Sequence, residues 1–184
     1  MNLKRARLVA LVVILAAVAV MVTLCMREPD EQLPDEGAAV EELGEGVQSV
    51  RLAFASRGAG RIVEERREIV VMEDPASRAR RIIEELAAGP MGEEADGTIP
   101  MGTRVLSVFF DGVGGAFVDF SSEFIDNHPG GSTGELFTIR SVVRTMSMNF
   151  PDVERVSILV DGSEIETIAG HIDASVPFPV EQYR

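Results

Sequence analysis

Residues 105–120 read VLSVFFDGVGGAFVDF and decide the fold of the central part of this chain. Two short runs rich in Val and Phe, 105–110 and 116–120, flank a loop at 111–115. Apolar and aromatic runs on both sides of a short glycine-rich loop are typical of a β-hairpin. The loop glycines, which we interpret as turn residues, are Gly112, Gly114 and Gly115. A phosphate-binding loop would need a following Lys-Ser or Lys-Thr pair, which the sequence lacks.

The segment before the hairpin predicts an amphipathic helix. Asp74-Pro75 is a start signal, because Asp74 supplies an N-cap acceptor and proline occupies a position that needs no N–H. Gly89-Pro90 is a stop signal, with glycine at the cap and proline unable to continue the helix. Between them, apolar residues recur at helical spacing at Ala79, Ile82, Ile83 and Leu86.

The segment after the hairpin predicts a second amphipathic helix. Ser132 or Thr133 can cap its start, and Glu135, three residues after Ser132, suits a capping box. Pro151 breaks the helix, because proline removes a backbone donor and clashes with the preceding turn. Its apolar face is expected at Leu136, Ile139, Val143 and Met146.

Four further segments, 50–54, 62–72, 156–160 and 165–168, read as strands. The order is then β-β-α-β-β-α-β-β. Two amphipathic helices must bury their apolar stripes against another layer, and a small mixed or antiparallel sheet supplies that layer. We therefore predict a single α+β domain over 47–184, with both helices on one face of the sheet.

An unbroken apolar run occupies residues 8–26. As a helix it would span about 28 Å, close to the roughly 30 Å hydrocarbon core of a bilayer. Lys4, Arg5 and Arg7 precede it, so the positive-inside rule keeps the N-terminus in the cytoplasm. Residues 1–27 are therefore predicted to be an uncleaved signal anchor, a single transmembrane helix that places the rest of the chain outside the cytoplasm.

The single cysteine, Cys25, lies inside this run and raises the alternative of a lipoprotein. A lipoprotein signal would have Leu three positions before the cysteine and a small residue directly before it, whereas this chain has Val22 and Leu24. We therefore expect the signal anchor rather than lipidation at Cys25. A cleaved signal is a third alternative, although no convincing A-x-A site is present.

Residues 28–46 predict a flexible acidic linker. Acids, prolines and glycines dominate this stretch and hydrophobic periodicity is absent, so it cannot bury enough apolar surface to offset the cost of ordering it. Glu41 and Glu42 are interpreted as solvated charges. Four of the 17 basic residues precede residue 28, which leaves 13 against all 30 acids. Such an acidic region argues against nucleic acid as a partner.

Short motifs in one order resemble the GerM domain family, which is named for sporulation and spore-germination proteins. They are 86–90 (LAAGP), 99–103 (IPMGT), 118–121 (VDFS), Thr145, 150–153 (FPDV), 156–162 (VSILVDG) and 170–173 (GHID). The resemblance covers roughly residues 50–177. It implies a bacterial extracytoplasmic domain on a lipoprotein or membrane anchor, with a fold like the ring-building modules of envelope-spanning machines. It also implies a role in assembly or scaffolding, with no established enzymatic activity.

No residue is predicted as a catalytic, cofactor-binding or metal site, and no cofactor is expected. The only histidines, His128 and His171, have no histidine at a ligand spacing; His171 and Asp173 could hold a metal, but a surface turn is the preferred interpretation. Ser121 follows Asp119 without the G-x-S-x-G pattern of a nucleophile elbow, so we interpret it as a strand-end hydrogen-bonding residue.

Phenylalanines cluster around the hairpin, and alternation along the strands must point some of them away from a covered face. We expect the helices to bury most of the rings; an uncovered patch would be a binding surface. The five residues are Phe109, Phe110, Phe117, Phe120 and Phe124. Arg140 and Arg144, one turn apart on the second helix, are interpreted as a solvated face.

Two functions follow from these observations. The first is a membrane-anchored envelope protein that acts as a non-catalytic assembly, scaffolding or protein-binding module, joining itself or other envelope proteins. The alternative is a cell-wall (peptidoglycan) enzyme or a wall-ligand-binding domain. That alternative needs acids that converge in one cleft, and Asp119, Glu123 and Asp126 are the acids that could do so.

Overall fold

The computed structural model describes residues 43–183 apart from Ala59, and these residues belong to one compact unit. The predicted anchor at 1–27 and most of the predicted linker at 28–46 lie outside the described residues. No helix within the described part of the chain has the length and apolarity needed to cross a membrane.

The elements follow one another in a mixed order. They are β1 (Leu43–Ser56), β2 (Ile62–Met72), α2 (Pro75–Ala87), β3 (Ala95–Asp96), β4 (Val105–Phe110), β5 (Gly115–Phe120), α3 (Glu123–Asp126), α4 (Ser132–Asn149), β6 (Arg155–Val160), β7 (Ser163–Glu164), β8 (Phe178–Pro179) and the 3₁₀ helix η1 (Val180–Tyr183). The start of β1 falls within the segment predicted as linker.

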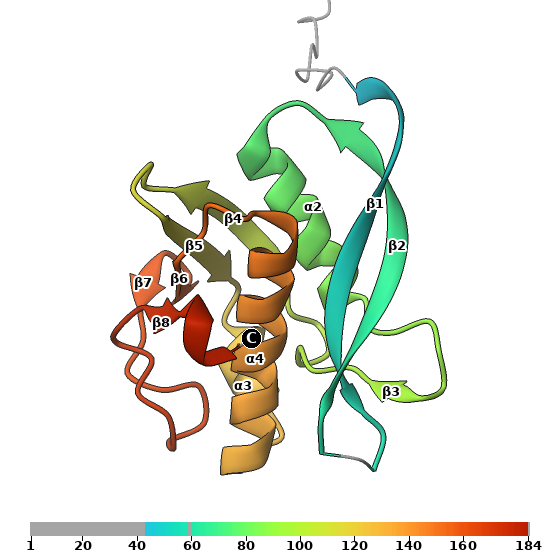
Figure 1. Ribbon diagram of the computed structural model, residues 1–184. Coiled ribbons are helices and arrows are strands. Elements are labelled where there is room, and N and C mark those ends of the chain that lie inside the picture. Colours follow the sequence, from blue (N-terminus) through green and yellow to red (C-terminus); the bar gives the residue numbers. More distant parts are fainter. Residues whose placement is uncertain (1–42, 59, 184) are drawn as a thin grey trace, which may run out of the picture. The chain divides into compact units, whose positions relative to one another are not determined.

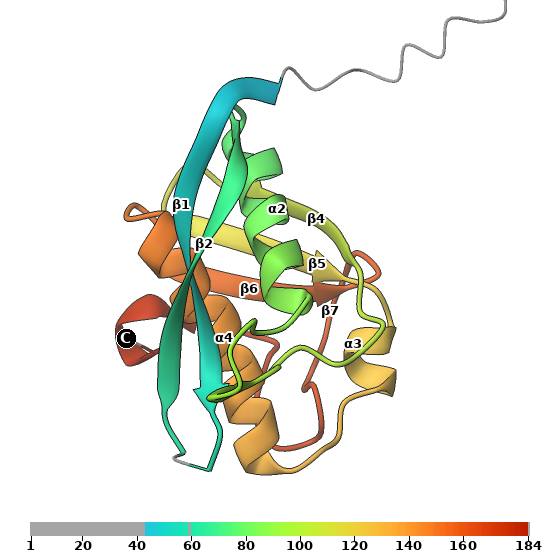
Figure 2. The same ribbon diagram turned by 90° about the vertical axis from the view of Figure 1, so that its right-hand side faces the viewer.

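Helices α2 and α4 lie between two sheets (Figures 1 and 2). The first sheet is antiparallel with strand order β2-β1-β3, and the second has the order β4-β5-β6-β7, with β8 also pairing with β6. Strands β5 and β6 are parallel, so the second sheet is mixed. The α+β class is as predicted, but the predicted arrangement, a single sheet with both helices on one face, is wrong.

Helix α4 shows why one sheet is not enough. Its buried residues include Ile139, Val143 and Met146, as predicted, but also Ser141 and Thr145 on another side of the helix. Leu136, expected on the apolar face, is 36% exposed. Small polar residues therefore face the first sheet, and a search for one apolar stripe does not detect this second buried side.

The predicted helix α2 and the predicted hairpin are confirmed, with β5 beginning at Gly115, one residue earlier than predicted. Asp74 caps α2 by accepting a hydrogen bond from the Ser77 N–H at 2.8 Å. In the β4–β5 turn, the Asp111 carboxylate accepts hydrogen bonds from the N–H groups of Val113 and Gly115, at 2.8 and 2.7 Å. A Cβ at position 115 would lie 2.2 Å from the Asp111 carboxylate, so this position requires glycine.

Two local predictions are wrong. Gly131 is the N-cap residue of α4 and no side chain caps the helix, so Ser132 and Glu135 do not form a capping box. Residues 165–168 are not a strand; β7 ends at Glu164 and the remaining pairing on β6 comes from β8. The capping box is absent because the Glu135 carboxylate binds the backbone N–H groups of residues 168, 169 and 171 instead of its own helix start.

Side chains of α4 close one edge of β1. The Asn149 amide accepts a hydrogen bond from the Arg51 N–H at 3.1 Å and donates one to the Arg51 carbonyl at 2.7 Å, as a neighbouring strand would. The Thr145 hydroxyl accepts from the buried Ala53 N–H at 3.0 Å. Further along the same edge, β3 pairs with Ala55 and Ser56. The edge is thus closed first by side chains and then by a strand.

The substitution Thr145→Val tests this edge. Valine keeps the side-chain volume but leaves the buried Ala53 N–H without an acceptor, so we expect the free energy of unfolding to fall by about 1–3 kcal/mol. Urea denaturation followed by circular dichroism measures it. Thr133→Val, at an exposed position of the same helix, is the matched control and should change stability by less than about 0.5 kcal/mol. Equal effects at the two positions would contradict the role of Thr145.

Candidate functional site

The three acids that could have formed a catalytic cleft each have a separate environment. Asp119 accepts a hydrogen bond from the Gly162 N–H at 2.9 Å. Glu123 lies 4.0 Å from the Arg104 guanidinium, and Asp126 is exposed at the end of α3. None of the three lines the cavities described below. The structure therefore does not gather these carboxylates around any of these cavities.

His128 is held as a neutral imidazole. Its Nδ1 accepts a hydrogen bond from the Gly130 N–H at 3.0 Å, and its Nε2 lies 3.1 Å from the Thr138 hydroxyl oxygen. The single Thr138 hydroxyl hydrogen is directed to carbonyl oxygens, of Thr98 at 2.7 Å and Gly134 at 3.1 Å, so Nε2 must donate. Burial lowers the pKa of His128, in agreement with this neutral form.

The contacts of His171 and Asp173 hold the loop that contains them. His171 Nδ1 lies 3.3 Å from a Glu135 carboxylate oxygen. Asp173 accepts hydrogen bonds from the N–H and the hydroxyl of Ser175, at 2.9 and 2.6 Å. Among the residues that the structure describes, no three His, Cys, Asp or Glu side chains are grouped so as to hold a metal. Ser121 is buried, and its hydroxyl accepts from the Arg104 N–H at 3.0 Å.

The face of α4 that we predicted to be solvated is partly buried. Arg144, like Arg140, is partly buried, and its guanidinium lies 2.6 Å from Glu64 on β2. This ion pair links α4 to the first sheet, next to the hydrogen bonds from Thr145 and Asn149.

The phenylalanine cluster divides between two faces of the second sheet. Phe120 and Phe124 are fully buried and stack at 4.3 Å between ring centroids, and Phe110 is half-buried beside Phe150. Phe109, by contrast, is 44% exposed and stacks on the half-buried Phe117. The helices thus bury part of the cluster, and one stacked pair remains on the outer face.

The Glu135 carboxylate is fully buried and fixes the loop after β7. It accepts hydrogen bonds from the backbone N–H groups of Ile168, Ala169 and His171, at 2.9, 3.1 and 3.0 Å. Burial by itself would raise the pKa of Glu135, but the backbone donors outweigh it and the pKa is lowered. The group is therefore a structural anchor and lacks the raised pKa of a general acid at neutral pH.

The pH dependence of stability should reveal this anchor. Because the folded-state pKa of Glu135 lies below its ordinary value of 4.5, its contribution is present above that value and is lost as the pH falls through the folded-state pKa. Near neutral pH, Glu135→Gln should lower the free energy of unfolding by about 2–3 kcal/mol. The difference between the two proteins should shrink as the pH falls from about 6 to about 3. A difference that is independent of pH in urea denaturation would contradict the assignment.

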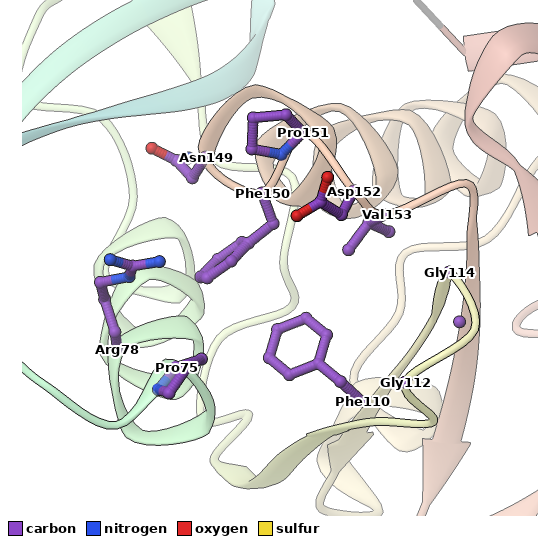
Figure 3. Close-up of a pocket in the computed structure, with 11 residues that line it drawn as sticks. Pro75, Arg78, Phe110, Gly112, Gly114, Asn149, Phe150, Pro151, Asp152 and Val153 are labelled. Carbon is purple, nitrogen blue, oxygen red and sulfur yellow. The ribbon is translucent and has the colours of Figure 1, made fainter.

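A cavity of about 430 Å³ lies where the β4–β5 turn, the start of α2 and the end of α4 meet (Figure 3). The Phe110 and Phe150 rings face each other inside it, with centroids 5.2 Å apart. The Arg78 guanidinium lies over the Phe150 ring, 4.9 Å from its centroid, as in a cation–π contact. The lining is completed by Pro75, Gly112, Gly114, Gly115, Asn149, Pro151, Asp152 and Val153.

This lining suits binding better than acid–base chemistry. Arg78 and Asp152 are its charged groups, while the Asn149 amide is engaged with the backbone of β1. Aromatic rings with few polar groups are typical of sites that take an apolar side chain. Sequence reasoning missed the cavity, although it had identified Phe150-Pro151-Asp152-Val153 as a motif, because the walls come from three segments far apart in the chain. Two other cavities, of about 490 and 450 Å³, lie beside β4 and beside the loop at 97–101.

The fold places the chain among small α+β domains in which two helices separate two sheets. A family model described as "Germane: Sporulation and spore germination" matches residues 51–166. The chain therefore belongs to this family, and the resemblance seen in the sequence motifs is confirmed. A comparison with curated proteins finds no match.

Three solved structures share the fold. A protein from Clostridium perfringens, described provisionally as a lipoprotein, is 24% identical with a TM-score of 0.53 and covers 74% of this chain and 90% of its own. The first GerMN domain of the sporulation protein GerM from Bacillus subtilis is 22% identical with a TM-score of 0.57, and the match covers 72% of this chain and 97% of that domain. The tandem GerMN domains of that protein are 20% identical with a TM-score of 0.56, and the match covers 72% of this chain and 46% of the tandem chain. Identities this low establish the fold alone.

Proposed function

We propose that this chain is a membrane-anchored bacterial envelope protein whose domain acts outside the cytoplasm as a non-catalytic protein-binding or assembly module. The observation that carries the proposal is the cavity between Phe110 and Phe150, whose walls are apolar and whose charges are one guanidinium and one exposed carboxylate. An acyl- or glycosyl-transferring site would need a nucleophile beside a base, or two converging carboxylates. A half-open apolar cavity instead suits a side chain of another protein.

Family and sequence support the location. The family is described by sporulation and spore germination, and a structural neighbour is described provisionally as a lipoprotein. The apolar run at 8–26, with basic residues before it, has the length and flanks of an anchor. The acidic stretch at 28–46 would hold the domain away from anionic lipid headgroups, since like charges repel.

The anchor makes a prediction about Cys25. The full chain, produced in a bacterium with a C-terminal tag, should sediment with membranes and be digested by protease added outside spheroplasts. Because the signal-anchor interpretation does not use Cys25, Cys25→Ser should leave the membrane fraction unchanged and lower the protein mass only by the difference between sulfur and oxygen. Labelling with a fatty-acid analogue provides the comparison. Label that is present in the wild type and absent from the serine variant would establish lipidation instead.

The cavity makes a prediction about contacts. A photo-crosslinking residue, p-benzoylphenylalanine, placed at the exposed Asp152 of the full chain should crosslink to other envelope proteins after illumination. The same residue at Glu93, which is also exposed but lies outside this cavity, is the matched control and should crosslink more weakly. Equal crosslinking at both positions would count against the cavity as a binding site. Release of soluble fragments from purified peptidoglycan, abolished by Asp119→Asn, would favour the enzyme alternative.

A further inference from the structure

The outer face of the second sheet carries an exposed aromatic pair. Phe109 and Phe117 are directly opposite each other in the β4–β5 ladder. Their rings stack at 4.6 Å with an interplanar angle of 5°, and Phe109 is 44% exposed. The neighbouring positions Ala116 and Val118 point to the other face of the sheet and are fully buried. Val113, at the tip of the same hairpin, is 70% exposed and extends the apolar surface.

Charge is distributed unevenly over the domain. Residues 47–104 hold ten acids and nine bases, whereas residues 105–183 hold twelve acids and three bases. The formal charge is therefore −1 for the first segment and −9 for the second. The second segment contains every strand of the second sheet, so the sheet with the exposed aromatic pair belongs to the acidic part of the domain.

Exposed acids lie near the aromatic pair, on the side of β6 and β7. At the hairpin end, Asp111 forms an ion pair with Arg155 at 2.5 Å, which neutralises the one arginine of the sheet, and Glu154 is exposed beside the turn. Glu164 on β7, two strands away from Phe117, is opposite Leu159 of β6 and is exposed. Phe117 pairs with Ser157 in the middle of the sheet. The rings thus form an apolar patch with exposed acids on the side of β6 and β7.

We propose that this face, centred on Phe109 and Phe117, binds an extended cationic segment of another envelope protein, in which Lys or Arg side chains flank an apolar residue. The proposal rests on the proposed function as a protein-binding module. Charge complementarity selects the partner, because ring faces attract cations and the exposed acids beside the rings attract the flanking basic residues. In an extended segment, side chains two positions apart point to the same side, so an apolar residue can lie on the rings while basic residues of the same row reach the acids.

Synthetic peptides test the proposal. The full chain is placed in nanodiscs of zwitterionic phosphatidylcholine, so that the lipid does not attract a cationic probe. Fluorescence anisotropy then compares a labelled ten-residue peptide that alternates Arg with Val and Tyr against versions with Glu or Ser in place of Arg. We expect the Arg peptide to bind, with an affinity that falls as salt rises, and the Glu and Ser peptides to bind on the order of tenfold more weakly.

Paired variants locate the binding surface. Phe109→Ala with Phe117→Ala should weaken the binding of the Arg peptide on the order of tenfold, as is typical of central aromatic contacts. Glu154→Gln with Glu164→Gln should weaken it about fivefold. The control Glu93→Gln with Glu94→Gln changes the net charge equally at exposed positions outside the second sheet and should leave the affinity unchanged. A thermal-denaturation curve for each variant confirms that it is folded.

Three outcomes would overturn the proposal. Equal losses from the two glutamate pairs would show non-specific attraction to a negative protein. An Arg peptide that binds folded Phe109→Ala, Phe117→Ala protein as tightly as wild type would show that the aromatic face is not used. Concentration-dependent association of the chain that requires the phenylalanines and blocks the peptide would make a second copy the occupant. Each outcome leaves the cavity crosslinks at Asp152 to be judged separately, so the proposed function can survive.

Discussion

Helix α4 reaches the backbone of β1 through two side chains, and the two-sheet architecture depends on this contact. The Asn149 amide matches both backbone groups of Arg51, and the Thr145 hydroxyl takes the buried Ala53 N–H. Without these partners, a strand edge inside the domain would keep unpaired donors. The first turn of the same helix contains Glu135, which fixes the loop after β7, and the helix ends beside Phe150, which lines the cavity. One element thus connects both sheets, the loop and the candidate site.

Local signals in the sequence predicted what local interactions determine. The Asp74 and Asp111 side chains accept hydrogen bonds from backbone N–H groups two or three residues further along the chain. The start of α2 and the β4–β5 hairpin therefore follow from residues a few positions apart. Glu135 had the spacing of a capping box, but its hydrogen bonds go to backbone groups 33 to 36 residues away. The role of Thr145 could not be predicted, because nothing near it in the chain indicates an acceptor for a strand edge 92 residues away.

The candidate site shows the same limit. The sequence motifs include both of its rings, Phe110 and Phe150, but the contact between them depends on how α4 and the hairpin pack. The carboxylates divide in a similar way. Glu135 and Asp111 are bonded to backbone N–H groups, which lowers their pKa values and makes them part of the framework. Exposed acids such as Glu154 and Glu164 contribute instead to the negative charge of the surface.

The parallel pairing of β5 with β6 has a consequence for biosynthesis. Residues 115–120 must wait for residues 155–160 before the centre of the second sheet can form, and β8 adds the last pairing at 178–179. Until then the hairpin presents Val118 and Phe120, both fully buried in the finished domain, to its surroundings. Pairings between distant segments slow folding and prolong exposure of apolar surface. The hairpin therefore stays prone to aggregation until residues 155–160 have been synthesised and have paired with β5.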